Sequence, residues 1–348
     1  SSSAASDVYK RQAEDCEIRT SYYGGGVVAY AQESEIVSCE NRASVSFEGP
    51  AGYVGGIAGY VALASSIDRC ENLGIVTGTV QPSDNYASCL VYAGGIAGVN
   101  QESAIINSSN HAVVAVEALP EYDSCAGGIV GYNSGSSTFI ANCYNAAGVR
   151  LSGSGFAGGI LSYTDNGDVR VANCYNVGTV SGVPGKSYPI VPILSADSED
   201  CYYLTNCVEG EGSYAGTALT VDYMKSTAFA ARLNDWSKTN NSSETGRQTL
   251  YWKVEDAEND GYPVFTDQDP GYTGVESVVS GVRIYPTTVS GELFVCGAES
   301  PIYIYNLAGH IVSIIDPTEE ITVVDMSRLL AGVYLVRTGD KVVRLVKL

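Results

Sequence analysis

Short apolar segments recur along the first two hundred residues of the chain, separated by glycine, asparagine and serine. A glycine pair followed by Val or Ile returns every 30 to 39 residues, and its five copies are Gly25 and Gly26, Gly55 and Gly56, Gly94 and Gly95, Gly127 and Gly128, and Gly158 and Gly159. Each pair precedes a Cys-x-Asn or Ser-x-Asn phrase and then a short run such as Gly-Ile-Val-Thr-Gly at 74–78. Short apolar segments between turn residues, without a helical period, predict β-strands. Each repeat therefore predicts three short strands.

One repeat of this kind cannot enclose a core, but stacked repeats can. Stacking lays the isoleucine that follows a glycine pair, such as Ile57 or Ile129, on its neighbour, and burial of each such side chain contributes about 1.5 to 3 kcal/mol. We therefore predict an all-β chain in which residues 13–203 form a right-handed parallel β-solenoid. Stacked propeller blades are the alternative, although their hairpins need tighter paired turns.

Two residue types occupy equivalent places in the repeats. The asparagines are Asn41, Asn72, Asn110, Asn145 and Asn176, and we expect their amides to hydrogen-bond along the stack as a ladder. The cysteine position gives the series Cys16, Cys39, Cys70, Ser108, Cys143, Cys174 and Cys201, which we interpret as an inward-facing column. The glycine pairs would supply the sharp corners or the close approach between coils.

The ten cysteines predict neither a metal site nor a disulfide framework. Paired metal-binding cysteines lie two to four residues apart on local turns, whereas these recur once per repeat in a register that also accepts Ser108. Buried cysteine behaves as a small hydrophobic residue, and parallel Cβ vectors suit a disulfide poorly. Four cysteines fall outside the column, and the sequence leaves their pairing open: Cys89, Cys125, Cys207 and Cys296. We expect no cofactor.

Candidate catalytic chemistry is sparse. The two histidines, His111 and His310, stand in no visible Ser-His-Asp or Cys-His pattern. Glu40 and Glu71 share a repeat register and are the pair of carboxylates that a glycoside hydrolase could use, but like charges in one column more often line a solvated face. The Thr-Asp-Asn-Gly-Asp loop at 164–168 suits a turn better than a calcium site.

Tyrosine is abundant, and its placement divides it into two groups. Tyr60, Tyr132, Tyr144 and Tyr175 recur at fixed positions, so we expect them to pack between coils. Tyr86, Tyr122 and Tyr163 lie outside the repeat columns, where exposed rings would stack on sugars or anchor a partner protein.

The net charge of −20 changes the range of partners. Such a chain repels nucleic acid phosphates and anionic membrane surfaces, and no apolar run approaches the roughly 20 residues that span a bilayer. We therefore expect neither nucleic acid binding nor membrane insertion. The Asp-Val-Tyr-Lys-Arg-Gln run at 7–12 resembles a translated sequencing adapter, so residues 1–12 are interpreted as non-native and set apart from the fold. The missing signal peptide then says nothing about export.

The repeat decays after Gly182, and a different pattern follows. Residues 220–234 predict one amphipathic helix with Thr220 as N-cap and with Met224, Ala228 and Ala231 on one face. We assign residues 204–266 to a small α+β cap over the solenoid end, and the turn-rich residues 267–274 to a linker. Seven alternating strands in residues 275–348 predict a β-sandwich.

Residues 275–348 resemble a type A sorting domain of the type IX secretion system. The resemblance rests on Tyr285 and Pro286, the run ending at Gly309, the run around Gly332, and the basic apolar end with Lys341 and Lys347. Thr287 and Thr288 depart from the Asn-Pro that usually continues the first motif. The resemblance implies export through the periplasm and the outer membrane of Bacteroidota by the type IX machinery, often followed by removal of the domain.

Residues 21–203 resemble the GLUG-type repeats of bacterial surface proteins and adhesins, through the Ala-Gly-Gly-Ile-Val-Gly-Tyr and Asn-Cys-Tyr-Asn phrases; Ser162 replaces one glycine. We therefore expect a secreted or surface-displayed, noncatalytic adhesin whose solenoid face binds a glycan or a bacterial or host surface protein. A polysaccharide lyase or glycoside hydrolase, and a stalk of a longer protein, are the alternatives.

Overall fold

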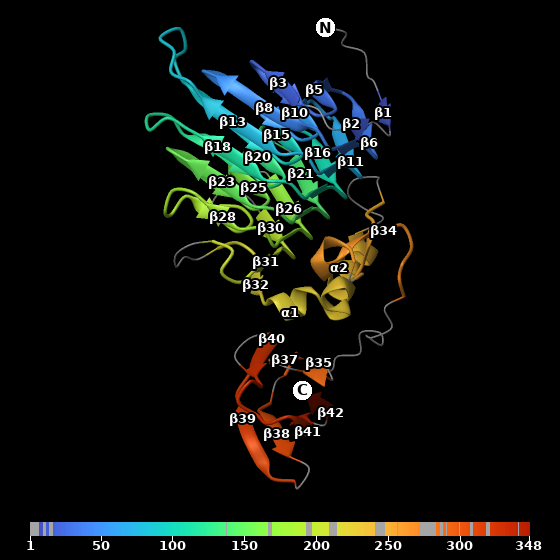
Figure 1. Cartoon of the computed structure of the whole chain (residues 1–348). Coiled ribbons are helices and arrows are strands. Elements are labelled where there is room, and N and C mark those ends of the chain that lie inside the picture. The colour runs from blue at the N-terminus through green and yellow to red at the C-terminus, as the bar shows by residue number, and fades with distance from the viewer. Residues whose placement is uncertain are drawn as a thin grey trace. The chain divides into compact units, whose positions relative to one another are not determined.

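The structure is a computed structural model of the chain (Figure 1). It describes every residue except 1–6, 10–11, 14–16, 137, 166–168, 193–196, 209–213, 241–247, 256, 272–282, 286–287, 290, 299, 307–308, 318–320 and 340. Two compact units make up the chain, residues 1–270 and 271–348. The first contains the repeats and the second the predicted sandwich.

Residues of the first unit form a parallel β-solenoid of five sheets, to which successive coils contribute one strand each. Sheet A contains β1 (Asp7–Tyr9), β6 (Glu35–Val37), β11 (Ser66–Asp68), β16 (Ala104–Ile106), β21 (Thr138–Ala141), β26 (Val169–Ala172) and β30 (Asp197–Glu199). Sheet B contains β2 (Gln12–Ala13), β7 (Glu40–Asn41), β12 (Glu71–Asn72), β17 (Ser109–Asn110), β22 (Tyr144–Asn145), β27 (Tyr175–Asn176), β31 (Tyr202–Leu204) and β32 (Thr217–Leu219).

The other three sheets complete each coil. Sheet C contains β3 (Glu17–Thr20), β8 (Ser44–Gly49), β13 (Val76–Val80), β18 (Val114–Glu117), β23 (Val149–Ser152) and β28 (Val180–Ser181). Sheet D contains β4 (Tyr23–Gly25), β9 (Ala51–Gly55), β14 (Leu90–Gly94), β19 (Ser124–Gly127), β24 (Gly155–Gly158) and β29 (Ser187–Tyr188). Sheet E contains β5 (Val28–Gln32), β10 (Ala58–Ala62), β15 (Ala97–Gln101), β20 (Val130–Ser134) and β25 (Leu161–Thr164).

The solenoid is confirmed, but its coils have five strands where the sequence predicted three. One extra division falls at the residue before each column cysteine, which adopts a left-handed backbone, as at Asn142 with φ of 52°. This corner separates sheet A from sheet B. The other division falls at the glycine pair, between sheets D and E. Paired strands also begin before residue 13, since Asp7 pairs with Glu35 and Gln12 with Glu40.

Each coil encloses two hydrophobic cores. The first lies between sheets A and E and holds the column cysteines and the isoleucines that follow the glycine pairs, such as Ile57. The second lies between sheets C and D and includes Val54 and Val76. Two cores form because the chain turns inward at the glycine pair, which divides the coil.

The predicted single helix is two helices. Thr220 caps α1 (Val221–Met224), accepting from the Tyr223 amide, but the helix stops at Lys225. Ser226 then accepts a hydrogen bond from the Phe229 amide at 3.2 Å and starts α2 (Thr227–Asn240). A serine side chain that bonds to the third following amide is a helix start signal, and it outweighs the continuous apolar period.

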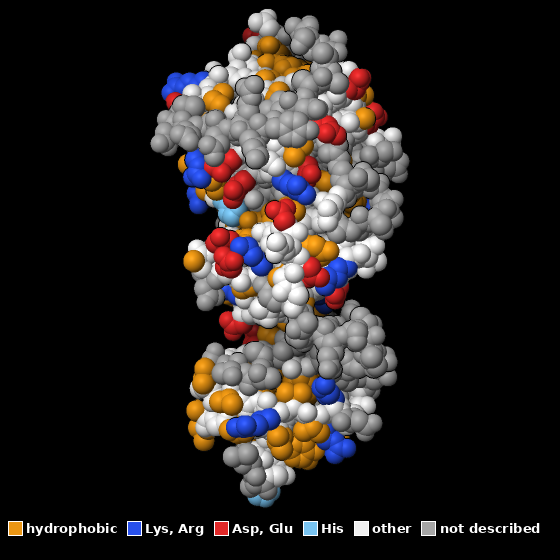
Figure 2. All heavy atoms as spheres, turned by 90° about the vertical axis from the view of Figure 1, so that its right-hand side faces the viewer, with side chains coloured by type: hydrophobic (Ala, Val, Ile, Leu, Met, Phe, Trp, Pro, Cys, Tyr) orange, Lys and Arg blue, Asp and Glu red, His pale blue; other side chains and the backbone are white. Residues whose placement is uncertain are grey.

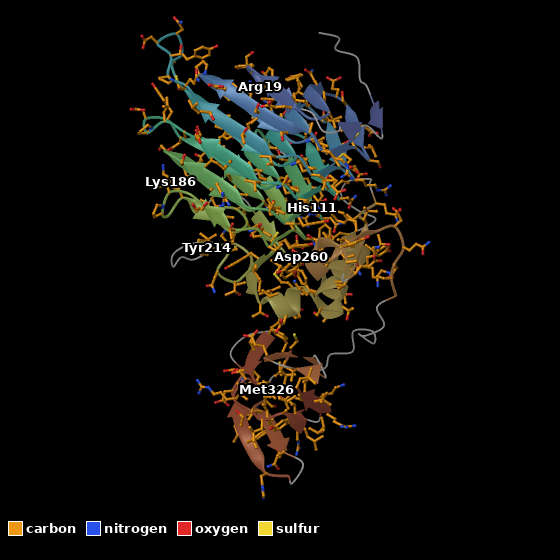
Figure 3. The ribbon with its side chains drawn as sticks, viewed as in Figure 1. Arg19, His111, Lys186, Tyr214, Asp260 and Met326 are labelled. Carbon is orange, nitrogen blue, oxygen red and sulfur yellow. The ribbon has the colours of Figure 1, made fainter. Side chains whose placement is uncertain are left out.

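Of the residues assigned to a cap, β32 and α1 lie at the solenoid end, and the segment after α1 lies beside the stack (Figure 1). α2, β33 (Tyr251–Lys253), η1 (Asn259–Gly261) and β34 (Val264–Thr266) lie along the flank of sheets A and B, whereas β32 extends sheet B beyond β31 (Figure 1). We call residues 227–266 the flank segment. Figure 3 labels His111 and Asp260, which lie where this segment meets the stack.

The second unit is a sandwich of two sheets, with eight described strands where the sequence predicted seven. One sheet contains β35 (Arg283–Tyr285), β37 (Glu292–Cys296) and β40 (Ile321–Asp325); the other contains β36 (Thr288–Val289), β42 (Lys341–Lys347), β41 (Gly332–Thr338), β38 (Ile302–Asn306) and β39 (Ile311–Ile315). Leu293 and Val324 from the first sheet pack with Ile304, Val336 and Leu345 from the second. Among the described residues, no helix of either unit is long and apolar enough to cross a membrane.

Candidate functional site

The asparagines of sheet B form a continuous hydrogen-bonded ladder. Each Nδ2 donates to the Oδ1 of the next rung at 2.8 Å, from Asn41 through Asn72, Asn110 and Asn145 to Asn176. Every amide also donates to the carbonyl two residues ahead, and all five side chains are fully buried. The ladder ends at Cys207, whose Sγ lies 3.7 Å from Asn176 Nδ2.

The glycine pairs and the asparagine ladder depend on each other. A Cβ atom on Gly56 would lie 2.2 Å from Asn72 Cγ and 2.2 Å from the Gly95 carbonyl oxygen. The other glycines at this position meet their own ladder asparagine in the same way. Any larger residue would displace the ladder, which explains why the two phrases repeat together.

The cysteine column faces the first core. Cys39, Cys70, Cys143, Cys174 and Cys201 are buried, as is Ser108 in the same column; Cys16 lies outside the described residues. Burial raises the pKa of the Cys174 and Cys201 thiols well above the ordinary value, so the thiolate needed for metal binding or nucleophilic attack is disfavoured. No disulfide joins two of the described cysteines, and no group of ligands among those residues could hold a metal ion.

A second asparagine ladder, which we call the corner ladder, runs along the corner between sheets A and B. The ladder of sheet B is called the inner ladder. Asn142 Nδ2 donates to Asn107 Oδ1 at 2.8 Å, and Asn173 Nδ2 donates to Asn142 Oδ1 at 2.7 Å. The same amides bind the flank segment: Asn142 Oδ1 accepts from Trp252 Nε1 at 2.8 Å, and Asn173 Nδ2 donates to the Leu233 carbonyl at 3.1 Å. Sequence reasoning missed this ladder, although Asn142 and Asn173 are the first asparagines of the two Asn-Cys-Tyr-Asn phrases and Asn107 holds the same place in Asn-Ser-Ser-Asn.

Aromatic rings form a continuous outer strip on sheets D and E, which we call the tyrosine face. Its residues are Tyr22, Tyr23, Tyr30, Tyr53, Tyr60, Tyr92, Tyr132, Phe156 and Tyr163. Tyr163 pairs with Tyr132 in the sheet, so its predicted position outside the repeat columns was wrong. Tyr22 and Tyr30 are exposed and the others partly exposed.

The rings of the tyrosine face stack on one another along the solenoid. The centroid distances are 5.5 Å from Tyr53 to Tyr92, 4.4 Å from Tyr92 to Tyr132 and 6.0 Å from Tyr132 to Tyr163. Because neighbouring rings cover each other's faces, the strip presents ring edges and hydroxyls. Partial burial raises the pKa of Tyr53, Tyr92 and Tyr132, so these phenols stay protonated and neutral at physiological pH.

The structure treats the other predicted tyrosines differently. Tyr144 and Tyr175 stack at 5.0 Å, but they face outward from sheet B and are covered by Trp252 and Phe265 of the flank segment. Tyr122 packs against the second core, and Tyr86 is 45% exposed.

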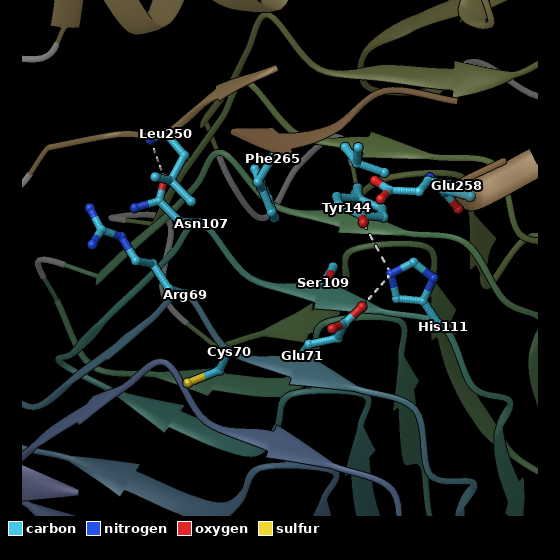
Figure 4. Close-up of a pocket in the computed structure, with 12 residues that line it drawn as sticks. Arg69, Cys70, Glu71, Asn107, Ser109, His111, Tyr144, Leu250, Glu258 and Phe265 are labelled. Atoms are coloured by element: carbon cyan, nitrogen blue, oxygen red, sulfur yellow. Dashed lines mark hydrogen bonds and ion pairs between the residues drawn. The ribbon is translucent and has the colours of Figure 1, made fainter. Parts of the chain in front are cut away.

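The predicted pair of carboxylates separates into two environments. Arg42 Nε forms an ion pair with Glu40, whereas His111 Nε2 lies 3.2 Å from Glu71 Oε1 and 3.0 Å from the Tyr144 hydroxyl. Burial, together with the nearby Glu40, raises the pKa of Glu71, and burial lowers the pKa of His111. Figure 4 shows Glu71, His111 and Tyr144 around one pocket. The sequence left His111 without a partner because Glu71 and Tyr144 come from the two neighbouring coils.

The remaining predicted sites are placed as follows. Of the 164–168 loop, residues 166–168 lie outside the described part of the chain. In the second unit, Tyr285 ends β35, Pro286 is not described, Gly309 has φ of 78°, and Gly332 begins β41. Lys341 is exposed at the start of β42, while Lys347 is buried near its end, where its Nζ donates to the Leu348 carbonyl at 2.6 Å. His310 is exposed.

No protein-family model and no curated protein matches the chain. Among solved structures, it is similar to one described as a putative immunoglobulin A1 protease from Bacteroides ovatus. The two share 23% sequence identity over 76% of each chain, with a TM-score of 0.46. A likeness at this level gives no information on the activity of this chain.

Proposed function

We propose that the protein is an exported, adhesin-like binding protein whose tyrosine face holds an extended neutral polysaccharide. The observation that carries this proposal is the continuous row of partly exposed, mutually stacked rings on the outside of the solenoid. Rungs of a sheet repeat at about 4.8 Å, so the row offers hydroxyls and ring edges at a regular spacing. A linear polymer is the ligand that meets many such groups at once.

Charge favours a neutral polymer over an acidic one. The chain carries a net charge of −20, and Asp165, next to Tyr132, is exposed. Polyanions would be repelled at long range, and the protonated phenols supply no counter-charge. The hydroxyls donate and accept hydrogen bonds, as Tyr60 does to Gln101 Oε1 at 3.0 Å, which suits the hydroxyls of a sugar.

The binding test uses the full chain and an array of neutral polysaccharides with their carboxymethylated and sulfated forms. We expect retention on a neutral polymer and about tenfold weaker binding when Tyr92 and Tyr132 are both changed to Ala, since an aromatic contact contributes about 0.5 to 1.5 kcal/mol. Tyr86→Ala is the matched control, because Tyr86 is exposed outside the face. Equal binding by the double variant and the wild type would contradict the proposal.

The same wells test the alternatives. Released sugar would favour a lyase or hydrolase and direct attention to Glu71 and His111, which the structure brings together in a pocket. Absence of both binding and products would favour a stalk.

Export by the type IX machinery is the second part of the proposal. It is supported by the two-sheet sandwich of residues 271–348 and by the resemblance of its motifs to a sorting domain. We expect deletion of residues 341–348 to leave the protein in the periplasm. However, this deletion removes Leu345 from the sandwich core, so misfolding alone would retain the protein.

A reporter fusion separates the two causes of retention. Residues 271–348 joined to a periplasmic reporter should carry it to the outside of a Bacteroidota host that has the secretion system. Retention of the folded fusion in the periplasm would refute the sorting role, whereas release that depends on the secretion system would support it.

A further inference from the structure

The flank segment and the solenoid enclose a pocket that the proposed polysaccharide binding does not use. It has a volume of about 470 Å³, within the range of small-molecule sites. Its walls come from sheet B and the preceding corners on one side, and from the η1 and β34 region of the flank segment on the other. Both walls belong to the first unit.

A break in the corner ladder opens this pocket. Asn107, Asn142 and Asn173 occupy the corner in three successive coils and bind the flank segment. In the preceding coil the same corner position holds Arg69, which is exposed with φ of 55°. The change from an amide to a guanidinium places a positive charge at this end of the pocket, which Asn107 and Leu250 also line.

The opposite end of the pocket is acidic. Glu71 and Glu258 line it together with His111 and Tyr144 (Figure 4). His111 does not neutralise these carboxylates at physiological pH, because burial lowers its pKa. Lys253 Nζ is 3.7 Å from Glu258 Oε2 but also pairs with Glu255 at 2.6 Å. Glu258 therefore keeps an uncompensated negative charge at this end, whereas the raised pKa of Glu71 lowers the share that Glu71 adds.

Between the two ends the lining is apolar and aromatic. Phe265, Val264 and Leu250 of the flank segment lie opposite the solenoid wall, and Figure 4 shows Arg69 with Asn107 and Leu250 on one side and the Glu71 group on the other. On the face drawn in Figure 2, acidic and basic side chains are interspersed over the first unit, without a large patch of either sign. The separation of charge is thus a local property of the pocket.

We propose that this pocket binds a small zwitterion of amino acid or dipeptide size. Its ammonium group lies against Glu71 and Glu258, its carboxylate faces Arg69, and its carbon skeleton packs on Phe265. A neutral sugar would leave both charged ends unmatched, and a simple anion or cation would match one of them.

Calorimetric titration of the full chain with phenylalanylglycine tests the proposal, together with the N-acetylated and C-amidated forms of the same dipeptide. We expect the zwitterion to bind and each blocked form to bind about fivefold weaker or worse, since each loses one charge pair in a partly desolvated site. Equal affinity of all three peptides, or no binding of any at millimolar concentration, would overturn the proposal.

Variants assign each end of the ligand. Glu258→Gln should weaken binding of the zwitterion about fivefold and leave the affinity of the acetylated peptide unchanged. Arg69→Met should also weaken binding of the zwitterion about fivefold, but it should leave the affinity of the amidated peptide unchanged. Glu117→Gln and Arg150→Met make the same charge changes at exposed positions outside the pocket lining, and should change no affinity. An equal effect of the control variants would show a response to net charge alone and would contradict the site.

Discussion

Two columns of stacked aromatic rings run along this solenoid, and they differ in what lies over them. In sheet B, Tyr144 and Tyr175 stack at 5.0 Å with their planes 6° apart, and they are 3% and 0% exposed. On the tyrosine face, Tyr92 and Tyr132 stack at 4.4 Å with planes 14° apart, yet both remain partly open to solvent. The repeat therefore produces two columns of stacked aromatic rings with similar geometry.

The difference comes from the flank segment, which covers one column and leaves the other. Both tryptophans of the chain lie in this segment, and Trp252 packs on the rings of Tyr144 and Tyr175. A repeat pattern reports which residues stack, but not which stacked face a later segment will cover. Stacking alone is therefore not evidence of either a structural or a binding role.

The largest expected effect comes from uncovering the sheet B column. Trp252→Ala removes a fully buried ring together with its hydrogen bond to Asn142, so we expect a loss of about 3 to 5 kcal/mol in the free energy of unfolding. Tyr92→Ala on the open face should cost about 1 kcal/mol. Chemical denaturation of both variants measures the contrast, and equal losses would show that the flank segment contributes little.

The corner ladder is the next point to break. Asn142 bonds to Asn107 and Asn173 and to Leu250, Trp252 and Ser237 of the flank segment. Asn142→Ala strands several of these buried groups and places alanine in a left-handed corner, so we expect about 2 to 4 kcal/mol of destabilisation. Increased protease cleavage within residues 227–266 should accompany it. If cleavage were no faster than in the wild type, the corner ladder would not be what holds the flank segment on the solenoid.

The sequence predicts the parts of this fold that repeat in every coil. The inner ladder follows from it because Asn41, Asn72 and Asn110 share one register and bond only to their neighbours and their own turns. The glycine pairs and buried cysteines follow for the same reason. The division between sheets A and B was missed because left-handed corners such as Arg69 carry no residue type common to all coils.

The covering of the stack could not be predicted from the repeat. Among the described coils, the corner ladder exists in three, and its partners lie far along the chain, since Gln248 comes 141 positions after Asn107. The pocket depends on the same contacts, since Glu71, His111 and Tyr144 come from three coils and Glu258 from the flank segment. Periodicity cannot bring such residues together.

The inner ladder provides a smaller effect that is independent of the covering. Asn145→Ala should lower the free energy of unfolding by about 1 to 3 kcal/mol, because it removes one buried hydrogen bond each from Asn110 Nδ2 and Asn176 Oδ1. Unlike Asn142→Ala, it should leave protease cleavage of residues 227–266 unchanged in the folded protein. An unchanged melting temperature would refute the energetic role of this ladder.

The smallest expected effect distinguishes the two columns by their hydroxyls. The Tyr144 hydroxyl lies 3.0 Å from His111 Nε2, so Tyr144→Phe should cost about 1 kcal/mol at neutral pH. No described residue is hydrogen-bonded to the Tyr92 hydroxyl, so Tyr92→Phe should cost less.

The pH dependence of these two variants sharpens the comparison. Burial raises the pKa of both phenols in the folded state, so their contribution to stability is complete below the unfolded value of about 10 and is lost as the pH rises above it. In this alkaline range each Phe variant should lose stability less steeply than the wild type, by up to about 1.4 kcal/mol per pH unit. A different outcome is that Tyr92→Phe keeps the wild-type slope of unfolding free energy against pH, while Tyr144→Phe has a shallower slope. The Tyr92 phenol would then ionise as freely in the folded protein as in the unfolded one, and the rings of the tyrosine face would be more accessible to a ligand than their stacking implies.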